Sequence, residues 1–560
     1  MSASDKKKLR KEQNAAAMTE KQLQAQKEAK KLKSYTLTFV VVMVLVVAIM
    51  VGIFVRTPIA GAISRGTHAV TIGNHQLSTA DLSYYYVDAI VSHYNQYINN
   101  YGDYGAMYAQ WMEGIDFSKP VGDQEHDKET GKTWAEYYID TAIDTAKQVY
   151  ALYDKAMADP DFKLSTSDQE YLDNFEDYVE MTASMNYYNS ASGYLRGRYG
   201  DGANMKTYKT YSEVSLIASE YYNAHQESLD YKDADYRAYE KDKYNEYSSF
   251  TYALYEVTAS KFLTGGTTTK DENGKETTTY SDEEKKAAEE AAKAAADALA
   301  VAENNTLEAL NKAIKAMEIN KKNTSAAATE NKDTLYNSIS NEDIRKWLSD
   351  DARKEGDMTV IEKSTTSTDA DGKETKTVSG YYVVLFQGKN DNLMKLQNVR
   401  HILVQFKGGT EDKDTGKVVY SDTEKATAEK KAQELLAQFK KGEKQDAEAF
   451  GELAKKNSDD TGSASTGGLY EDIYPGQMVE PFEKWCFDES RKAGDTGVVE
   501  TEYGFHVMYY VGADELTFRD YMIDADMTSE EMEKWNDSIV DPVTVTKVNV
   551  NGINADYKLG

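Results

Sequence analysis

An internal repeat constrains the fold of this chain more than any other feature. Residues 270–298 resemble residues 411–439, residues 344–363 resemble 482–501, and residues 380–391 resemble 504–515. The middle pair shares a Lys-Trp step with Gly-Asp following at the same distance. A common bias toward Lys, Glu and Ala does not produce such spacing. The repeat therefore predicts two tandem modules of related fold, the first module at 246–391 and the second module at 394–516.

The length of 560 residues is too great for one hydrophobic core and predicts several domains. Residues 1–34 hold ten Lys or Arg against four Asp or Glu, a balance of +6. The whole chain has a net charge of −29, so the remaining residues carry −35. This strongly acidic balance argues against binding to nucleic acid and against docking on anionic lipid.

One apolar segment, residues 35–55, contains 21 residues without a charge. As a helix it would be about 30 Å long, enough to cross the hydrocarbon core of a bilayer. The basic residues 1–34 place the N-terminus in the cytoplasm by the positive-inside rule. Cleavage as a signal peptide is the alternative, because Ala60 and Ala62 form an A-x-A site, but the long apolar run favours an uncleaved anchor. We therefore expect a single-pass membrane protein with the bulk of the chain extracytoplasmic.

A mainly helical domain is predicted over residues 67–245. Apolar residues at three- and four-residue spacing predict helices at 79–100, 134–158, 168–187 and 205–229. Three of them begin with potential capping boxes: Ser78 with Asp81, Thr133 with Glu136, and Ser167 with Glu170. The many tyrosines of this domain are interpreted mainly as core residues, with a tyrosine-lined groove for unfolded chains as the alternative.

The tail, residues 517–560, reads as a helix followed by an alternating strand. We expect this strand to pair beside residues 68–73, which would complete the N-terminal domain. The single cysteine, Cys486, cannot form an intramolecular disulfide, so the exported domains have to be stabilised by packing.

The second module contains an ordered set of motifs. His401 lies in VRHILV and His506 in TEYGFHVMYYV, and between them stand NSDDTGS, TGGLYED and PGQMVEPFEKWCF. This set resembles the parvulin family of peptidyl-prolyl cis/trans isomerases, in the branch of PrsA- and SurA-like foldases. The resemblance covers about residues 396–516 and implies an α+β module. The helical domain ahead of the modules resembles the chaperone lobe of such foldases by its order and helix content alone.

The resemblance also implies the roles of individual residues. His401 and His506 match the paired histidines of the family, on adjacent central strands, and Thr501 matches the hydroxyl position of the same network. Asp460 falls where some parvulins carry cysteine and others aspartate, so a thiolate mechanism does not apply. The residues that match the substrate-binding pocket for the proline ring are Leu469, Gln477, Met478 and Phe482.

Two departures from the family pattern narrow this interpretation. Tyr503 stands where several relatives have serine, next to the expected network. The loop GGTEDKDTGK after the first strand has no Arg or Lys cluster, which phosphate recognition requires, so a phosphoserine-proline preference is not expected. Cys486 is interpreted as a packing residue.

The first module appears in this comparison as a degenerate copy. The comparison places Tyr252 opposite His401, and aligning GYYVVL with GFHVMY places Tyr382 opposite His506. Ile344 takes the place of Phe482, and Met478 has no counterpart. We expect this module to fold without catalysing isomerisation.

The sequence thus predicts a multi-domain α+β foldase that isomerises X–Pro bonds of exported polypeptides and requires no metal or other cofactor. The alternative is a non-catalytic holdase or assembly scaffold that uses both modules only to bind peptides. Clients and oligomeric state stay open.

Overall fold

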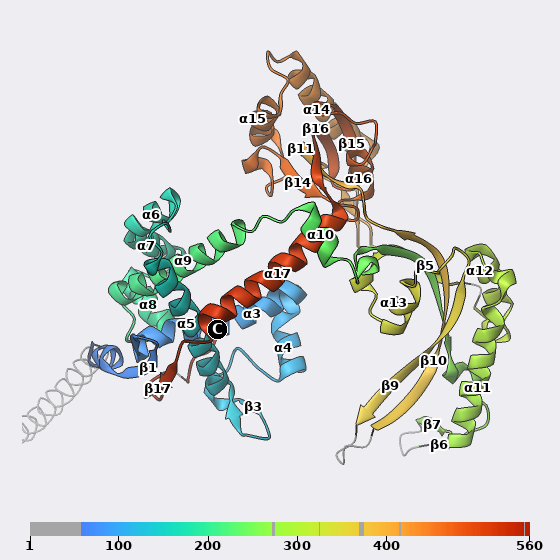
Figure 1. Cartoon of the computed structure of the whole chain (residues 1–560), viewed down its shortest axis with the longest axis horizontal. Helices are drawn as coiled ribbons and strands as arrows, with labels where there is room; N and C mark the ends of the chain where they lie inside the picture. The colour runs from blue at the N-terminus through green and yellow to red at the C-terminus, as the bar shows by residue number, and fades with distance from the viewer. Residues whose placement is uncertain are drawn as a thin grey trace, which may run out of the picture. The chain divides into compact units, whose positions relative to one another are not determined.

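The computed structural model describes residues 58–270, 275–323, 325–368, 374–413, 416–553 and 555–559 (Figure 1). The chain divides into two compact units: unit 1 comprises Met1–Asp230 and Glu530–Gly560, and unit 2 comprises Tyr231–Ser529. The predicted membrane anchor, residues 35–55, and the segment before it lie outside the described residues. Within the described ranges, no helix has both the length and the apolar character needed to cross a membrane.

Unit 1 is mainly helical, as predicted. Its helices are α3 (Thr79–Tyr101), α4 (Gly105–Glu113), α5 (Trp134–Ala158), α6 (Thr166–Asp173), α7 (Phe175–Met185), α8 (Ala191–Tyr199) and α9 (Met205–Glu227). Capping boxes are present at Ser78 and Thr133. The third predicted box is wrong: Ser165, rather than Ser167, caps α6 by accepting from the Asp168 N–H. The predicted helix over 168–187 is two helices, which meet at Asn174.

A small sheet joins the two ends of unit 1. Its strand order is β17-β1-β2, from β17 (Val545–Lys547), β1 (His68–Ile72) and β2 (His75–Ser78). The strand of the C-terminal tail pairs antiparallel with β1, with Val70 opposite Lys547 and Ile72 opposite Val545. The pairing expected from the sequence is therefore present. A short hairpin, β3 (Glu125–Asp127) and β4 (Lys132–Thr133), precedes α5.

The tyrosines of unit 1 mostly belong to its core. Tyr84, Tyr86 and Tyr138 are almost fully buried, and the ring of Tyr84 stacks on Tyr211 with centroids 5.1 Å apart. Tyr187 is the contrary case, since 97% of its side chain is exposed. The interpretation of these residues as packing residues holds for the buried ones.

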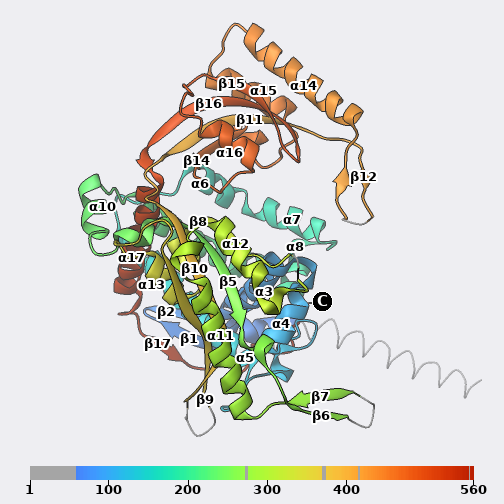
Figure 2. The same ribbon diagram turned by 90° about the vertical axis from the view of Figure 1, so that its right-hand side faces the viewer.

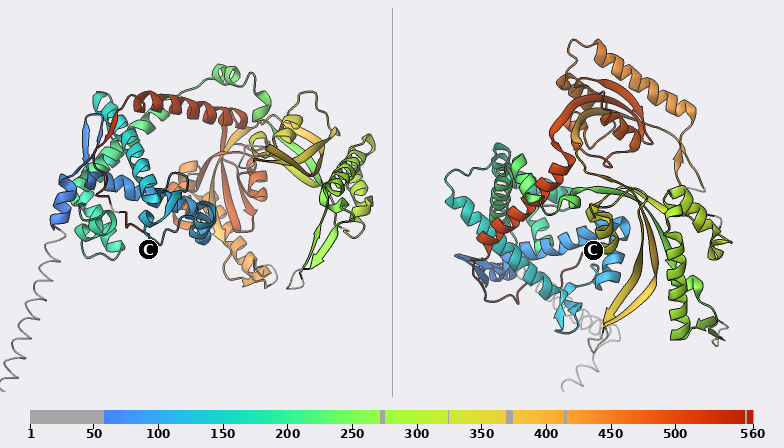
Figure 3. Two further views of the ribbon diagram at one scale, coloured as in Figure 1. Left: turned by 90° about the horizontal axis from the view of Figure 1, so that it is seen from below. Right: turned by 45° about the vertical axis from the view of Figure 1, so that its right-hand side comes forward.

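The first module of unit 2 contains a four-stranded sheet with the order β8-β5-β10-β9 (Figure 2). Its strands are β5 (Ser249–Thr258), β8 (Thr329–Leu335), β9 (Met358–Thr368) and β10 (Glu374–Asn390). Beyond the sheet, β9 and β10 continue as a long paired arm (Figure 3). The remaining elements of the module are the hairpin β6 (Thr267–Lys270) and β7 (Glu276–Thr279), α11 (Asp282–Leu299), α12 (Leu307–Ala316) and α13 (Glu342–Leu348), and α10 (Asp233–Tyr239) precedes the module. Helix α10, inside the predicted range 67–245, lies in unit 2.

The second module repeats this arrangement with the strand order β14-β11-β16-β15. Its strands are β11 (Lys395–Gln405), β14 (Leu469–Ile473), β15 (Thr496–Glu500) and β16 (Gly504–Thr517), and the hairpin is β12 (Thr410–Glu411) with β13 (Val418–Val419). Its helices are α14 (Asp422–Lys441), α15 (Ala447–Asn457) and α16 (Glu480–Cys486), followed by α17 (Phe518–Val540). The fold is thus multi-domain α+β, as the sequence predicts.

Alternation along the central strands gives this second sheet two buried faces. Phe505, Val507 and Tyr509 of β16 pack in the cluster that contains α14 and α15. Met508 and Tyr510 point the other way, into a second cluster with Phe482 and Cys486 of α16. His506 alternates with the first set and therefore faces α16.

Candidate functional site

The two central strands bring the predicted histidines together. In the antiparallel pairing of β11 and β16, His401 stands opposite Met508 and Leu403 opposite His506. The histidines are therefore diagonal neighbours on one face of the sheet. Their Nδ1 atoms lie 3.0 Å apart and their rings stack with centroids 5.2 Å apart. Both side chains are almost fully buried.

A chain of hydrogen bonds passes through this pair. The Nε2 of His401 lies 2.8 Å from Oδ2 of Asp460, and the Nε2 of His506 lies 2.8 Å from Oγ1 of Thr501. An ionised carboxylate only accepts, so His401 donates from Nε2 and accepts at Nδ1. His506 then donates from Nδ1 and accepts the Thr501 hydroxyl at Nε2. We infer one tautomer for each ring from this direction.

The surroundings fix the charge of each group. Burial alone would raise the pKa of Asp460, but hydrogen bonds from Ser463, His401 and the Gly462 N–H outweigh it and hold the pKa at about 2. Burial lowers the pKa of His506 to about 3, with the nearby His401 adding to the shift. Burial also lowers the pKa of His401, against the opposing effect of Asp460. Near neutral pH the site therefore holds one anion and two neutral imidazoles.

Two residues of this network were not predicted from the sequence. Ser463 donates its hydroxyl to Oδ2 of Asp460 at 2.5 Å, and the Tyr470 hydroxyl donates to the same oxygen at 3.1 Å. The spacing of Asp460 and Ser463 in NSDDTGS, three residues apart, is the one sequence feature that points to the first contact. Nothing in the motif TGGLYED points to the second.

An apolar cluster covers the histidines. The ring of Phe482, on α16, meets His401 and His506 edge-on, with centroid distances of 5.5 and 5.3 Å. Met478 is half-buried in the same cluster, just before the helix. The two residues predicted to bind a proline ring are thus brought together above the network.

The other two predicted pocket residues lie differently. Leu469 stands opposite Arg400 in the sheet, so it faces away from the histidines and is absent from the cluster around Phe482. Tyr470, opposite Val399, occupies that place instead. The register shift on β11 and the left-handed backbone of Asp472 (φ 54°) accompany this change of face. Gln477 is exposed, and its side-chain oxygen accepts the Tyr474 N–H at 3.2 Å.

Two further residues that the sequence singles out are Tyr503 and Cys486. The Tyr503 N–H donates to Thr501 Oγ1 at 3.2 Å, while 55% of the Tyr503 side chain is exposed. Cys486 is buried, and burial raises the pKa of its thiol to about 12, so a thiolate is not available there.

Comparison with known proteins matches this part of the chain to one family. Residues 381–511 fit the family model of the PPIC-type PPIase domain. The chain contains a parvulin-type domain. The second module, which holds the network described above, is referred to below as the parvulin module.

The similar proteins include bacterial foldases. Foldase protein PrsA 1 of Listeria innocua is 38% identical over 80 residues, which are 14% of this chain and 26% of that protein. Foldase protein PrsA of Staphylococcus epidermidis is 29% identical over 187 residues, 32% of this chain and 53% of that protein. The crystal structure of PrsA from Bacillus subtilis aligns with 16% identity and a TM-score of 0.23, over 73% of this chain and 86% of that chain. The matches thus span about a quarter to a half of these two foldases.

The strand register allows the two modules to be compared residue by residue. In the parvulin module a bulge leaves Val511 unpaired between Asn398–Gly512 and Val399–Tyr510. In the first module an equivalent bulge leaves Gln387 unpaired between Thr251–Gly388 and Tyr252–Phe386. Superposing the bulges makes Tyr252 the counterpart of Val399.

The prediction that Tyr252 replaces His401 is therefore wrong by two residues, and Leu254 stands at the histidine position. Tyr382 does correspond to His506, since each pairs with its edge strand at the same step of the repeat, opposite Ile361 and Val499. Lys363 corresponds to Thr501 and donates to Glu256 at 2.8 Å.

Proposed function

We propose that the parvulin module catalyses cis/trans isomerisation of X–Pro bonds and that the chain is an extracytoplasmic foldase. The observation that carries this proposal is the closed network of Asp460, His401, His506 and Thr501 directly beneath Phe482. It lies within the residues that match the PPIC-type PPIase family. The PrsA relatives support the foldase role.

The chemistry requires no bond to be broken. Amide resonance sets a barrier of about 20 kcal/mol, so uncatalysed isomerisation takes tens of seconds. A millionfold acceleration requires the twisted amide to be bound about 8 kcal/mol more tightly than the planar one. A slot for the proline ring and a few fixed polar groups near the carbonyl are sufficient for such differential binding.

In this proposal Phe482 and Met478 bind the proline ring. The hydrogen-bonded network forms the base of this pocket and keeps its shape. Each histidine uses both ring nitrogens within the network: His401 toward His506 and Asp460, His506 toward His401 and Thr501. The histidines are thus positioning residues. Asp460 supplies a fixed negative charge, which disfavours the planar amide because that form places negative charge on the carbonyl oxygen.

We propose that the first module is not an isomerase. Leu254 and Tyr382 stand at the histidine positions, Lys363 at the position of Thr501, and Ile344 at that of Phe482. Apolar residues including Phe250, Ile344, Leu348 and Val384 still form a buried cluster, which supports a stable fold. The remaining role is that of a spacer or a peptide-binding surface.

The isomerase proposal is tested with the full-length chain on a short X–Pro peptide. Phe482→Ala and Met478→Ala should each lower kcat/KM at least tenfold, because the ring loses its slot. Cys486→Ala is a matched control: it empties buried volume behind the same helix without touching the histidine rings. Equal activity of a Met478→Ala/Phe482→Ala double variant and the unaltered chain would refute the pocket.

We further propose that residues 35–55 anchor the chain with the N-terminus in the cytoplasm. This proposal rests on the apolar run and the basic segment before it. Protease added to intact cells should remove the parvulin module, detected with an antibody against it. Protection of that module until the cells are lysed would contradict the topology.

A further inference from the structure

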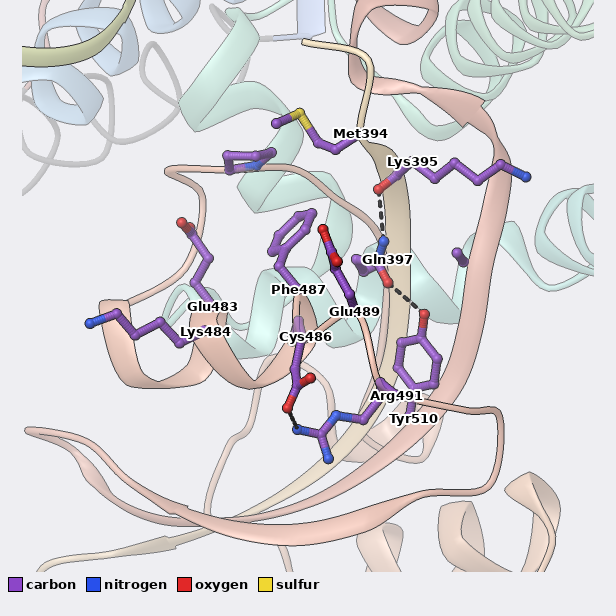
Figure 4. Close-up of a pocket in the computed structure, with 13 residues that line it drawn as sticks. Met394, Lys395, Gln397, Glu483, Lys484, Cys486, Phe487, Glu489, Arg491 and Tyr510 are labelled. Carbon is purple, nitrogen blue, oxygen red and sulfur yellow. Dashed lines mark hydrogen bonds and ion pairs between the residues drawn. The ribbon is translucent and has the colours of Figure 1, made fainter. Parts of the chain in front are cut away.

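A groove of about 660 Å³ lies on the parvulin module away from the histidine network (Figure 4). Side chains of α16 and the turn after it form one side, and side chains of β11 and β16 form the other (Figure 4). Its lining includes Met394, Lys395, Phe487, Glu489 and Ala513. Neither histidine, nor Asp460, Thr501, Met478 or Phe482, is among the lining residues, so the groove is distinct from the proposed catalytic slot.

The internal repeat gives this groove a counterpart in the first module. The match of residues 344–363 with 482–501 makes Ser349 the counterpart of Phe487 and Asp351 that of Glu489. The match of 380–391 with 504–515 makes Lys389 the counterpart of Ala513.

In the first module this place is filled by the chain itself. The side-chain amide of Asn245 donates to the Ser349 carbonyl at 2.6 Å and to the Asp351 carboxylate at 2.7 Å. Its oxygen accepts the Lys389 ammonium at 2.9 Å, and that ammonium also lies 5.3 Å from the centre of the Tyr244 ring. A short segment with an asparagine beside an aromatic residue therefore plugs the groove of the first module.

In the parvulin module the segment that corresponds to Tyr244 and Asn245 makes different contacts and does not fill the groove. The register that makes Tyr252 the counterpart of Val399 makes Asn392 the counterpart of Asn245. Asn392 is buried, donates its amide to the Tyr247 carbonyl at 2.9 Å and accepts the Ser249 hydroxyl at 3.2 Å. It holds the connection between the modules, and the groove next to it is left open.

The charges of the open groove fit an uncharged amide donor. Arg491 pairs with Asp488 at 3.2 Å and Lys484 is in contact with Glu480, so these cations are already balanced. Glu489, exposed and in the place of Asp351, has no such ion pair among the described residues. Lys395 lines the same groove at the edge next to Ala513, the counterpart of Lys389, and its ammonium pairs with Glu515 at 3.1 Å.

We propose that this groove binds an extended segment of client polypeptide through an asparagine or glutamine side chain next to an aromatic residue. The segment would bind as Tyr244 and Asn245 do in the first module. The site goes beyond the proposed isomerase activity and does not depend on it. It would hold a client on the parvulin module while the separate slot acts on a proline elsewhere in the same chain.

The test uses a fluorescent peptide with the sequence of residues 241–250, KDKYNEYSSF, titrated into the full-length chain and followed by anisotropy. A second peptide carries alanine at the asparagine. Loss of the amide, or the substitution Glu489→Lys, should weaken binding about tenfold, the loss expected for a hydrogen bond to a charged group. Glu443→Lys, at an exposed position of the same module, is the charge-matched control and should bind like the unaltered chain.

The catalytic slot supplies the second control. Phe482→Ala should leave binding of this proline-free peptide unchanged, even if isomerase activity is lost. Binding that Phe482→Ala abolishes and Glu489→Lys leaves intact would place the peptide in the slot and overturn the proposal. Binding only after Asn392→Ala would show that the chain plugs its own groove, and a peptide that dissociates dimers of the chain would show that a second copy fills it. Either result, or no binding at millimolar peptide, also overturns the proposal.

Discussion

Asp460 is the residue on which the charge of the candidate site depends. Four groups donate to it: His401, Ser463 and Tyr470 to one oxygen, and the Gly462 N–H to the other at 3.1 Å. The carboxylate thus stays ionised in a half-buried position and fixes the direction of every hydrogen bond that follows. Removing a donor hydroxyl while keeping the rest of the side chain should therefore affect isomerisation through Asp460.

Tyr470→Phe removes one of these donors and keeps the ring. A lost hydrogen bond to a carboxylate costs about 1.5–3 kcal/mol, so the pKa of Asp460 should rise. We expect kcat/KM to fall several-fold and the acidic limb of its pH profile to move to higher pH. Tyr336→Phe, the same change at a tyrosine in the apolar cluster of the first module, is the control and should leave both unchanged. A rate loss without movement of the acidic limb would contradict the role of Tyr470 at Asp460.

The buried histidines predict how stability depends on pH. The pKa of His506 is lowered to about 3, so the unfolded chain takes up a proton there that the folded module does not. The contribution of His506 to the free energy of unfolding is present above pH 6.5. It is lost as the pH falls toward 3, by about 1.4 kcal/mol per pH unit. The lowered pKa of His401 acts in the same direction.

Hydrogen exchange of the β16 amides, corrected for intrinsic rates, should therefore report lower stability at pH 5 than at pH 7. His506→Gln removes one titrating group, so its exchange free energy should change less steeply with pH, whatever its absolute value. An unchanged slope would show that His506 is protonated in the folded module.

Among the elements, the paired strands set the limits of what the sequence predicts. His401 and His506 could be identified from the sequence because each lies in a strand whose flanking residues match motifs of the parvulin family. The counterpart of His401 in the first module was misplaced by two residues because a strand repeats its side-chain direction every two residues. Alternation cannot distinguish Tyr252 from Leu254, and the bulges at Gln387 and Val511 fix the register.

The face on which the Leu469 side chain lies could not be predicted for a related reason. The left-handed Asp472 and the register shift near it change which face β14 presents, and neither leaves a recognisable motif. The groove beside α16 could not be predicted from the sequence either, because it is open only when the neighbouring segment around Asn392 is held by other contacts.

The helices α13 and α16 allow a matched prediction for the two modules. Ile344 and Phe482 are equivalent and are 2% and 3% exposed. Replacing either by alanine should destabilise its own module by about 2–5 kcal/mol. Only Phe482→Ala should remove isomerase activity from the full-length chain, because the first module lacks the network. An activity loss with Ile344→Ala while the parvulin module stays folded would show that the first module takes part in catalysis.

At the scale of the whole chain, unit 1 is built from both ends of the sequence. Beyond the strand β17, residues near the C-terminus return to the N-terminal segments: the Gly122 N–H donates to the Ala555 carbonyl at 2.9 Å, and the Leu559 N–H donates to the Phe117 carbonyl at 2.8 Å. Both modules are thus an insertion between two parts of one domain. The strand pattern VTVTKV predicted the sheet pairing, whereas the hydrogen bonds beyond it lie in a segment without periodicity.

The C-terminal segment after β17 should therefore stabilise unit 1, although the N-terminal part of that unit lies almost 500 residues earlier in the sequence. Ile553 is 6% exposed within the main core of unit 1, so Ile553→Ala should lower the stability of that unit by about 2–5 kcal/mol. Hydrogen exchange in β1 and α3 should become faster, while exchange in β11 and isomerase activity stay unchanged because unit 2 has its own cores. Val548→Ala, at a side chain 54% exposed in the same segment, is the control and should cost less than about 0.5 kcal/mol. Equal effects of the two substitutions would show that the C-terminal segment is not part of the folded core of unit 1.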